Sequence, residues 1–212
     1  MPGGRLVTSD VAPEMVDVAR RRATELGVSD VAFAIEDAAS LSFDDRSFDG
    51  VLWRWGPMLV PDMEAAIREL RRVLRPGGRA AIAVWASPSA NEWMTASGRA
   101  ALELGLVDPP DRDAPGPFRL AGDGLLSEAL EHGGLHVEVV EDVAMTWEAP
   151  SLGDWWSISC DMSRMLALLA ERLTLDELRA VKERAEELLA GYVRPDRTLV
   201  VPGLARVALA TR

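Results

Sequence analysis

Residues 48–85 constrain the fold more than any other part of the sequence. A short apolar run at residues 51–55 is followed by Pro61 and Asp62, and a second apolar run occupies residues 80–85. Between the two runs, apolar side chains recur at the spacing of a helix with one buried face. These side chains are Met63, Ala66, Ile67, Leu70, Val73 and Leu74. Two nearly uniformly apolar strands joined by one helix indicate a pair of parallel strands with helices on both faces of the sheet.

Signals at the ends of this helix support the assignment. Asp62 precedes the first apolar position and is suited to cap the start of the helix. The run 76–78, Pro-Gly-Gly, predicts its end, because proline and glycine are disfavoured inside a helix.

The residues before this unit predict a strand, a helix and a second strand. Residues 3–10 predict a glycine turn followed by a short strand that ends at Asp10, and Pro13 suits the first turn of the helix that follows. We expect this helix to end at Gly27. Its inward face is predicted to carry Met15, Ala19, Ala23 and Leu26. A strand at residues 31–35 and a loop or short helix at residues 36–47 complete this part of the chain.

The pattern after Trp85 predicts more helix than strand. We expect helices at residues 91–104 and 123–132, a surface loop at 107–117, and a strand at 135–147 with a bulge near Val139. Residues 151–190 predict a helical insertion, with helix starts of the capping-box kind at Ser151 and Thr174. The predicted fold class is therefore α/β, a Rossmann-like and mostly parallel sheet with flanking helices and a helical insertion before the last strand.

Composition limits the partners. A chain of 212 residues suits one α/β domain, and a net charge of −11 argues against nucleic acid and against an anionic membrane surface. We expect neither a signal peptide nor a membrane span of ~20 apolar residues. The single cysteine, Cys160, excludes an internal disulfide and fits a cytoplasmic protein with a buried, inert thiol. With only His132 and His136 as imidazoles, no metal site is expected.

The ends of the strands are where a ligand is expected, because an open parallel sheet binds ligands outside the carboxyl ends of its strands. Asp10 follows the first predicted strand, Glu36 and Asp37 follow the second, and Arg54 ends the third. One carboxylate can accept hydrogen bonds from a ribose diol and another from an exocyclic amine, which describes an adenosine site. Alternatively, Asp10 caps the helix at Pro13 and the other two acids belong to a solvated loop. Spacing alone leaves both interpretations open.

Three consecutive segments resemble the class I S-adenosylmethionine-dependent methyltransferases, in particular the methyltransferase type 11 group that includes the ubiquinone and menaquinone C-methyltransferases. The segments are TSDVAPEMVDVAR, IEDAASLSFDDRSFDGV and WRWGPMLVPDMEAAIRELRRVLRPGGRAAIAVW. Together they cover residues 3–85 almost continuously. PFRLAGDGLLSEALEHGGLHVEVVE and TLVVPGLARVALATR are similar to later segments of the same family.

The resemblance implies methyl transfer from S-adenosylmethionine to a small, apolar or aromatic molecule. It places Asp10 on the ribose hydroxyls, Met15 on the adenine, and Asp37 and the Ala38 backbone on the adenine edge. Val11 and Arg54 complete the implied cofactor site. Nothing in the sequence identifies a catalytic general base, and His132 and His136 lie away from the strand tips.

The resemblance also divides a single domain spanning residues 1–212 into parts. These are a cofactor-side core at 1–86, a loop and helices at 87–134, a strand at 135–147, a helical substrate cap at 151–190 and the last strand at 203–210. Tryptophans are abundant, and a substrate pocket is predicted to contain Trp55, Met58, Trp155 and Trp156. Trp53 and Trp85, inside strands, are expected in the core, and Asp154 is expected to cap a helix.

The sequence departs from the family pattern in one respect. The family's first strand and its glycine-rich loop would precede Gly3, and residues 1–212 do not contain them. We expect two strand edges to lack a partner as a result, next to the strands that end at Asp10 and Arg54. Truncation is the favoured explanation. A degraded relative, or a neighbouring chain that fills the gap in a homo-oligomer, are the alternatives.

Two other functions are consistent with a sheet of this kind. A non-catalytic methyltransferase-like relic or interaction subunit would keep the sheet without binding the cofactor. A nicotinamide-dependent oxidoreductase would need a G-x-G-x-x-G run after a strand, and the sequence has none.

Overall fold

The structure is a computed structural model that describes residues 4–111 and 114–212. Gly3 and residues 112–113, which fall in the predicted glycine turn and the predicted surface loop, lie outside the described residues. The elements follow in the order β1 (Leu6–Asp10), α1 (Pro13–Glu25), β2 (Val31–Ile35), β3 (Phe48–Arg54), α2 (Met63–Val73), β4 (Leu74–Trp85), α3 (Glu92–Glu103), α4 (Leu125–His132), β5 (His136–Ala149), α5 (Leu152–Met162), α6 (Arg164–Arg172), α7 (Leu175–Leu189) and β6 (Leu199–Thr211).

The described strands form two separate sheets. In the smaller sheet β1 pairs with β2 in parallel, and in the larger sheet the strand order is β3-β4-β6-β5. β3 and β4 are parallel, whereas β6 runs antiparallel to both of its neighbours. The predicted α/β fold is confirmed, and the pairs β1–β2 and β3–β4 are parallel as expected. The last strand, β6, is antiparallel to its neighbours and makes the larger sheet mixed.

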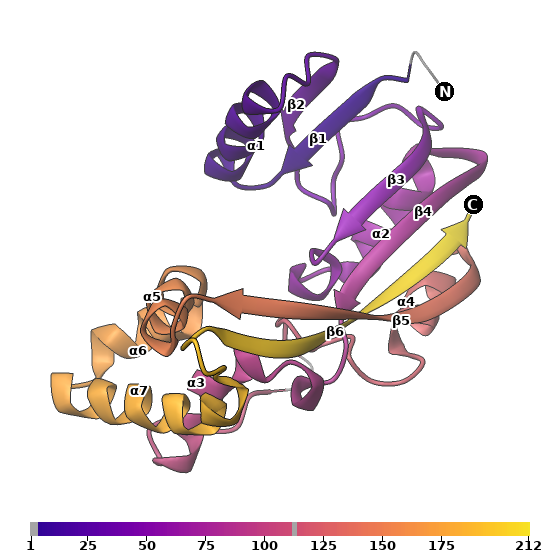
Figure 1. Cartoon of the computed structure of the whole chain (residues 1–212). Coiled ribbons are helices and arrows are strands. Elements are labelled where there is room, and N and C mark those ends of the chain that lie inside the picture. Colours follow the sequence, from indigo (N-terminus) through magenta and orange to yellow (C-terminus); the bar gives the residue numbers. More distant parts are fainter. Residues whose placement is uncertain (1–3, 112–113) are drawn as a thin grey trace.

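Figure 1 shows the small sheet, with α1 packed against it, standing apart from β3. Residues 36–47 cross from β2 to β3 as a loop without a helix. The strand edges expected to lack a partner are therefore present: within the described residues, β1 has no neighbour except β2, and β3 none except β4.

The split sheet leaves α1 half covered. Val16 is buried and Ala19 and Ala23 are half-buried, but Met15 and Leu26 are exposed. The prediction that Met15 and Leu26 face inward is therefore wrong. A sheet of two strands is too narrow to cover the full apolar face of a helix.

Strand β4 begins directly after α2, at Leu74, six positions before the predicted start. The ladder with β3 shifts register between Phe48 and Gly50, which pair with Leu74 and Arg79. Residues 75–78 thus form an irregular step within β4, and Gly77 adopts a left-handed φ of 77°. The Pro-Gly-Gly run breaks the strand ladder and lies beyond the helix end at Val73, which corrects the prediction for this run.

The predicted caps are present. The Asp62 carboxylate accepts a hydrogen bond from the Ala65 N–H at 2.9 Å, and the Ser151 hydroxyl accepts one from the Asp154 N–H at 3.1 Å. Thr174 and Glu177 form a complete capping box at the start of α7. Each bond satisfies a backbone donor that the first turn of a helix leaves without a partner.

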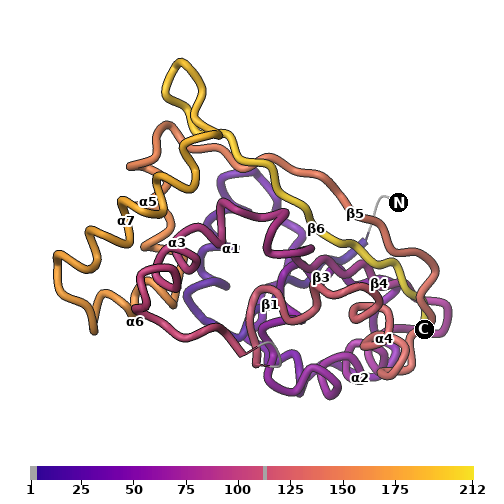
Figure 2. Tube along the Cα trace, turned by 90° about the horizontal axis from the view of Figure 1, so that it is seen from below, coloured from indigo at the N-terminus to yellow at the C-terminus, as the bar shows by residue number. Residues whose placement is uncertain are grey.

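The hydrophobic core lies beside the larger sheet. Strands β5 and β6 run side by side as a long ribbon from the C-terminus to the helices α5, α6 and α7 (Figures 1 and 2). Helix α3 packs against α7 at the far end of this ribbon. Trp155, on α5, is fully buried, and its indole N–H donates to the Trp93 carbonyl at 2.8 Å. The helical insertion is therefore fixed to the sheet through α3.

Asn91 joins α3 to β6. Its side chain is wholly buried. The amide nitrogen donates to the carbonyls of Ser87 and Leu204, at 3.2 and 3.0 Å, and the amide oxygen accepts from the Leu204 N–H at 3.0 Å. The side chain thus imitates a strand partner at the position where β6 loses β4 as a neighbour.

Replacing Asn91 with alanine should lower the free energy of unfolding by about 2–3 kcal/mol, because the Leu204 N–H loses its partner and the Leu204 carbonyl keeps only the bond from the Ala86 N–H. Urea denaturation would measure the change, with no change expected in the m-value. Ser89→Ala, on the exposed face of the same turn, is the control and should stay within about 0.5 kcal/mol of the parent chain. An equally small effect of Asn91→Ala would contradict this role.

Candidate functional site

The opening between β1 and β3 is a groove with a volume of about 600 Å³. Its walls come from the carboxyl ends of β1, β2 and β3 and from the face of α2. Because parallel strands end at the same edge of a sheet, their tips bring side chains from three separate segments to one place. The lining residues of the tips are Thr8, Ser9, Asp10, Val11, Glu36, Asp37, Ala38, Trp53, Arg54, Trp55 and Gly56.

Five of the six residues predicted to bind the cofactor line this groove: Asp10, Val11, Asp37, Ala38 and Arg54. The sixth, Met15, lies on α1 outside the lining set, and its side chain is exposed. Their roles in binding stay predictions.

The four predicted pocket residues do not lie together. Trp55 lines the groove. Met58 and Trp155 are buried in the core, and Trp156 is half-buried on α5, where its ring lies 6.1 Å from that of Trp155. Because Trp155 is buried and Trp156 is half-buried against the core, and neither lines the groove, these two side chains do not form a wall of it.

Asp10 is held in place by its own loop. One carboxylate oxygen accepts a hydrogen bond from the Ala12 N–H at 2.9 Å. This bond orients the chain into α1, whose N-cap residue, Ala12, has no capping side chain. The alternative role of Asp10, which is to hold the start of α1, therefore uses one carboxylate oxygen. The other oxygen has no partner in the described part of the chain.

The tip of β2 is tied to the tip of β1. The Glu36 N–H donates to the Asp10 carbonyl at 3.0 Å. The Glu36 carboxylate accepts from the Ser42 N–H at 2.8 Å and from its hydroxyl at 2.5 Å, and Asp37 accepts from the Ala39 N–H at 2.9 Å. Glu36 is thus engaged within its loop, whereas Asp37 lines the groove and its second carboxylate oxygen has no partner among the described residues.

Trp55, at the tip of β3, has a constrained backbone. Its φ of 55° lies in the left-handed region, which is uncommon for a bulky residue. Its N–H donates to the Ala83 carbonyl at 2.8 Å, and its ring stacks on Trp85 with centroids 4.4 Å apart. The Arg54 guanidinium lies 4.6 Å from the Trp55 ring centroid, a cation–π arrangement.

Gly56 permits this geometry. A Cβ at this position would lie 2.2 Å from the Trp53 indole nitrogen, so any side chain would displace that ring. Trp53 is half-buried and lines the groove, while Trp85 is buried as predicted.

Sequence reasoning missed two features of the site. The first is a series of aromatic contacts that continues from Trp55 through Trp85. The Trp85 ring meets the Trp93 ring edge-on, with centroids 5.4 Å apart, and the Trp93 ring stacks on the Trp147 ring at 5.4 Å. The indole nitrogens of Trp55 and Trp93 are buried and have no hydrogen-bond partner among the described residues. The second is Phe43, which lines the groove and meets Phe48 edge-on at 5.1 Å. It lies in a polar turn, where only its size could have signalled burial.

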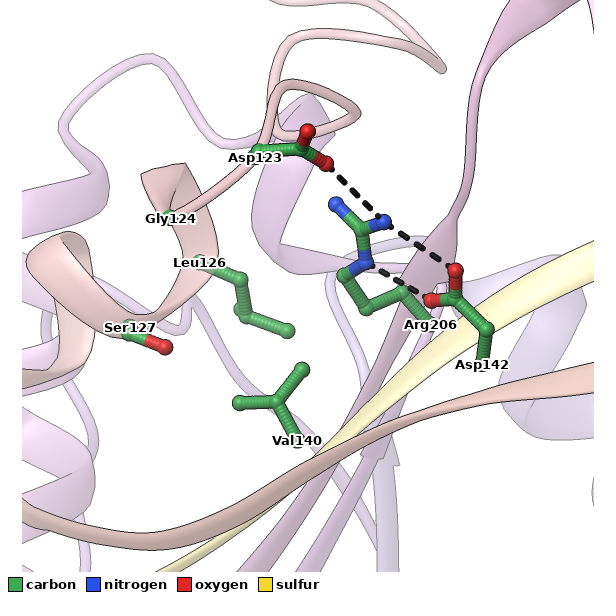
Figure 3. Close-up of a pocket in the computed structure, with 7 residues that line it drawn as sticks. All are labelled: Asp123, Gly124, Leu126, Ser127, Val140, Asp142 and Arg206. Carbon is green, nitrogen blue, oxygen red and sulfur yellow. Dashed lines mark hydrogen bonds and ion pairs between the residues drawn. The ribbon is translucent and has the colours of Figure 1, made fainter.

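A second pocket, of about 380 Å³, lies between α4 and the β5–β6 ribbon (Figure 3). Arg206 makes two hydrogen bonds to the Asp142 carboxylate, at 2.7 and 3.1 Å, and its guanidinium lies 3.3 Å from Asp123. It also donates to the carbonyls of Ala121 and Gly122. Since its donors are all engaged, Arg206 acts as a tether between the sheet and the loop before α4.

The remaining candidates have no place in the groove. His132 and His136 are exposed at the end of α4 and the start of β5. Cys160 is exposed as well, which corrects the expectation of a buried thiol, and partial burial and nearby Asp161 raise its pKa. Asp154 caps α5, as expected. Among the described residues no cluster of three potential metal ligands is present, and no helix there is long and apolar enough to cross a membrane.

The N-terminal part of the chain is similar to a known protein family. Residues 1–82 match the family model described as a methyltransferase domain. This part of the chain is therefore similar to that family, and the match covers less than half of the 212 residues.

The chain also resembles curated proteins over part of its length. It is 37% identical over 89 residues to a ubiquinone/menaquinone biosynthesis C-methyltransferase of Hahella chejuensis, covering 42% of this chain and 36% of that protein. It is 41% identical over 87 residues to a demethylmenaquinone methyltransferase of Thermus thermophilus, covering 41% and 39%. The matched segments thus span well under half the length of these relatives.

Solved structures extend the likeness of fold to nearly the whole chain. A putative methyltransferase from Bacillus halodurans superimposes with a TM-score of 0.61 at 19% identity, covering 98% of this chain and 83% of its own. The [4+2]-cyclase SpnF superimposes with a TM-score of 0.56 at 20% identity, covering 98% and 66%. The methyltransferase-like fold is therefore shown for the chain, and because a cyclase shares it, fold alone does not specify the reaction.

The Arg206 tether should make stability depend on pH. Arg206 lowers the pKa of Asp142, so the ion pair contributes fully above the ordinary aspartate pKa of ~3.9 and is lost as the pH falls through the lowered value. The double-mutant coupling between Asp142→Asn and Arg206→Gln, measured by urea denaturation, should shrink between pH 6 and about pH 2.5. Coupling that stays constant over this range would contradict the assignment.

Proposed function

We propose that this chain carries the cofactor-side half of a site for S-adenosylmethionine-dependent methylation of a small, apolar or aromatic molecule. One observation carries the proposal: Asp10, Asp37 and Arg54, from the tips of three different strands, line one groove in a chain whose residues 1–82 match a methyltransferase domain. The likeness to a ubiquinone/menaquinone biosynthesis C-methyltransferase and to a demethylmenaquinone methyltransferase supports an aromatic, quinone-like acceptor, and the first of these supports transfer to carbon.

The groove residues fit the adenosine part of the cofactor. Asp10 has one carboxylate oxygen without a described partner, fixed in direction by the bond from Ala12 to the other oxygen. A pre-oriented carboxylate is suited to accept hydrogen bonds from the two ribose hydroxyls. Asp37 is oriented in the same way through Ala39 and is suited to the adenine amine, and Val11 offers an apolar side chain beside the base.

Arg54 and Trp55 are the groove residues suited to the reactive end. The Arg54 guanidinium can pair with the carboxylate of the methionine part, and its contact with Trp55 restricts where it points. The Trp55 ring, stacked on Trp85, offers a rigid aromatic wall to a planar acceptor.

The chemistry needs little from the protein beyond position. S-adenosylmethionine supplies a methyl group on a positively charged sulfur, and in-line attack by the acceptor forms its bond to the methyl carbon as the carbon–sulfur bond breaks, leaving a neutral thioether. The chain's residues hold the reactants in line and exclude water, which are the main contributions expected for such a transfer. The acceptor's proton passes to solvent after the transfer, when the site opens, because none of the described groove residues is assigned as a general base.

The partners follow from charge and placement. We propose a small-molecule substrate, bound with the helices α5–α7 as its cap, and no nucleic acid or membrane partner, because a net charge of −11 repels phosphates. The alternative is a non-catalytic, methyltransferase-like interaction protein, which the titrations below distinguish.

Asp10→Ala should weaken the binding of S-adenosylhomocysteine by about tenfold or more, because a charged acceptor for the ribose hydroxyls is removed. Isothermal titration calorimetry on the 212-residue chain measures this affinity. Asp17→Ala, on the exposed face of α1, is the matched control and should bind as the parent chain does. Equal affinities for Asp10→Ala and Asp17→Ala would remove the ribose assignment, and no binding by the parent chain would favour the non-catalytic alternative.

A further inference from the structure

The indole of Trp55 has a neighbour on each of its two faces. It stacks on the Trp85 ring, with centroids 4.4 Å apart and ring planes inclined by 10°. The Arg54 guanidinium also lies over the Trp55 ring, 4.6 Å from its centroid. Trp85 is buried, Trp55 is half-buried and Arg54 is exposed, which places the guanidinium on the outer face of the ring. The ring therefore lies between a buried indole and an exposed cation.

The Trp55 ring has little freedom to move. Its backbone has a φ of 55°, and its backbone N–H donates to the Ala83 carbonyl at 2.8 Å. The indole nitrogen is buried and has no hydrogen-bond partner among the described residues, so the edge of the ring that carries it points into the protein. Because Trp55 lines the groove, its outer face is the part of the ring that a ligand can contact.

Arg54, in contrast, is held by one weak contact. Within residues 4–111 and 114–212 its guanidinium makes no hydrogen bond and no ion pair, and it contacts only the Trp55 ring. At an exposed site the attraction between a cation and an aromatic ring is weak, and a charge-assisted pair with a carboxylate is stronger. A carboxylate that binds in the groove can therefore draw the guanidinium off the ring.

We propose that Arg54 covers the acceptor's place on Trp55 until the cofactor binds. The inference rests on the proposed function, in which the methionine carboxylate of S-adenosylmethionine pairs with Arg54 and a planar acceptor stacks on Trp55. The acceptor cannot stack while the guanidinium covers the outer face of the ring. Pairing with the carboxylate moves the guanidinium and uncovers this face, so the cofactor binds first and the acceptor second.

The same contact restricts the class of acceptor. An acceptor with its own carboxylate would draw Arg54 away without the cofactor, and a cationic acceptor would be repelled by the nearby guanidinium. An uncharged planar acceptor is therefore the class whose binding depends on the cofactor. Because coupling between two ligands is reciprocal, this acceptor also strengthens the binding of the cofactor by the same factor.

The test measures the affinity of coumarin, an uncharged planar probe, by isothermal titration calorimetry on the 212-residue chain. With saturating S-adenosylhomocysteine, which carries the methionine-type carboxylate, coumarin should bind about tenfold more tightly than without it. Methylthioadenosine is the matched ligand, because it keeps the adenosine part and lacks the carboxylate. It should leave the affinity for coumarin within about threefold of the value without a ligand.

Variants assign the coupling to Arg54. In Arg54→Met the ring is uncovered from the start, so coumarin should bind equally well with and without saturating S-adenosylhomocysteine. Arg20→Met is the matched control, because the Arg20 guanidinium lies 5.2 Å from the centroid of another ring, that of Phe33, on the small sheet. It should keep the full coupling. Trp55→Leu should lose coumarin binding and keep its affinity for S-adenosylhomocysteine within about threefold.

The outcomes separate this inference from the proposed function. If S-adenosylhomocysteine does not bind to the parent chain, the proposed function fails and the inference fails with it. If it binds and the affinity for coumarin does not change, or if Arg54→Met keeps the coupling, the inference alone is overturned. Equal enhancement by methylthioadenosine, or no coumarin binding with S-adenosylhomocysteine present, would also overturn it and leave the cofactor site in place.

Discussion

The double pairing of β4 is the interaction on which the rest of the structure depends. β4 pairs in parallel with β3 and in antiparallel with β6, and Ala80, Ile82 and Val84 along it are fully buried. β6 in turn carries β5 and, through Asn91, the helix α3. The helical half of the molecule and the tip of β3 are both positioned from this strand, so the wall of the groove that bears Arg54 and Trp55 is rigid.

The other wall has no such support. The β1–β2–α1 unit is connected to the larger sheet through the loop at residues 36–47, which is held to α2 by Arg72. The Arg72 guanidinium donates to the carbonyls of Leu41 and Phe43, and to the carboxylates of Asp45 and Glu69. Arg72 lowers the pKa of both acids. The two walls of the candidate site thus depend on different interactions.

The sequence predicted the elements well because their signals are local. Helical spacing and the cap at Asp62 located α2, and the capping box at Thr174 located α7. The positions of Asp10, Asp37 and Arg54 at strand ends were enough to predict that they share one edge of the sheet, and the groove contains all three.

The errors concern contacts between segments far apart in sequence. Met15 was predicted to face inward from its spacing in α1, but the sheet beneath that helix has only two strands. Trp155 resembled a pocket residue, yet its indole bonds the Trp93 carbonyl in the core. The left-handed backbone of Trp55 could not be predicted from the neighbouring sequence. It occurs together with stacking on Trp85, which lies on another strand.

The account's central claim is that the tips of β1, β2 and β3 form one ligand site. Hydrogen–deuterium exchange of the 212-residue chain with and without saturating S-adenosylhomocysteine tests this most directly. We predict slower exchange in residues 10–12, 36–39 and 54–56 together, with no change around Arg206 in the second pocket. Slower exchange at only one of the three tips, or at the second pocket instead, would contradict the claim.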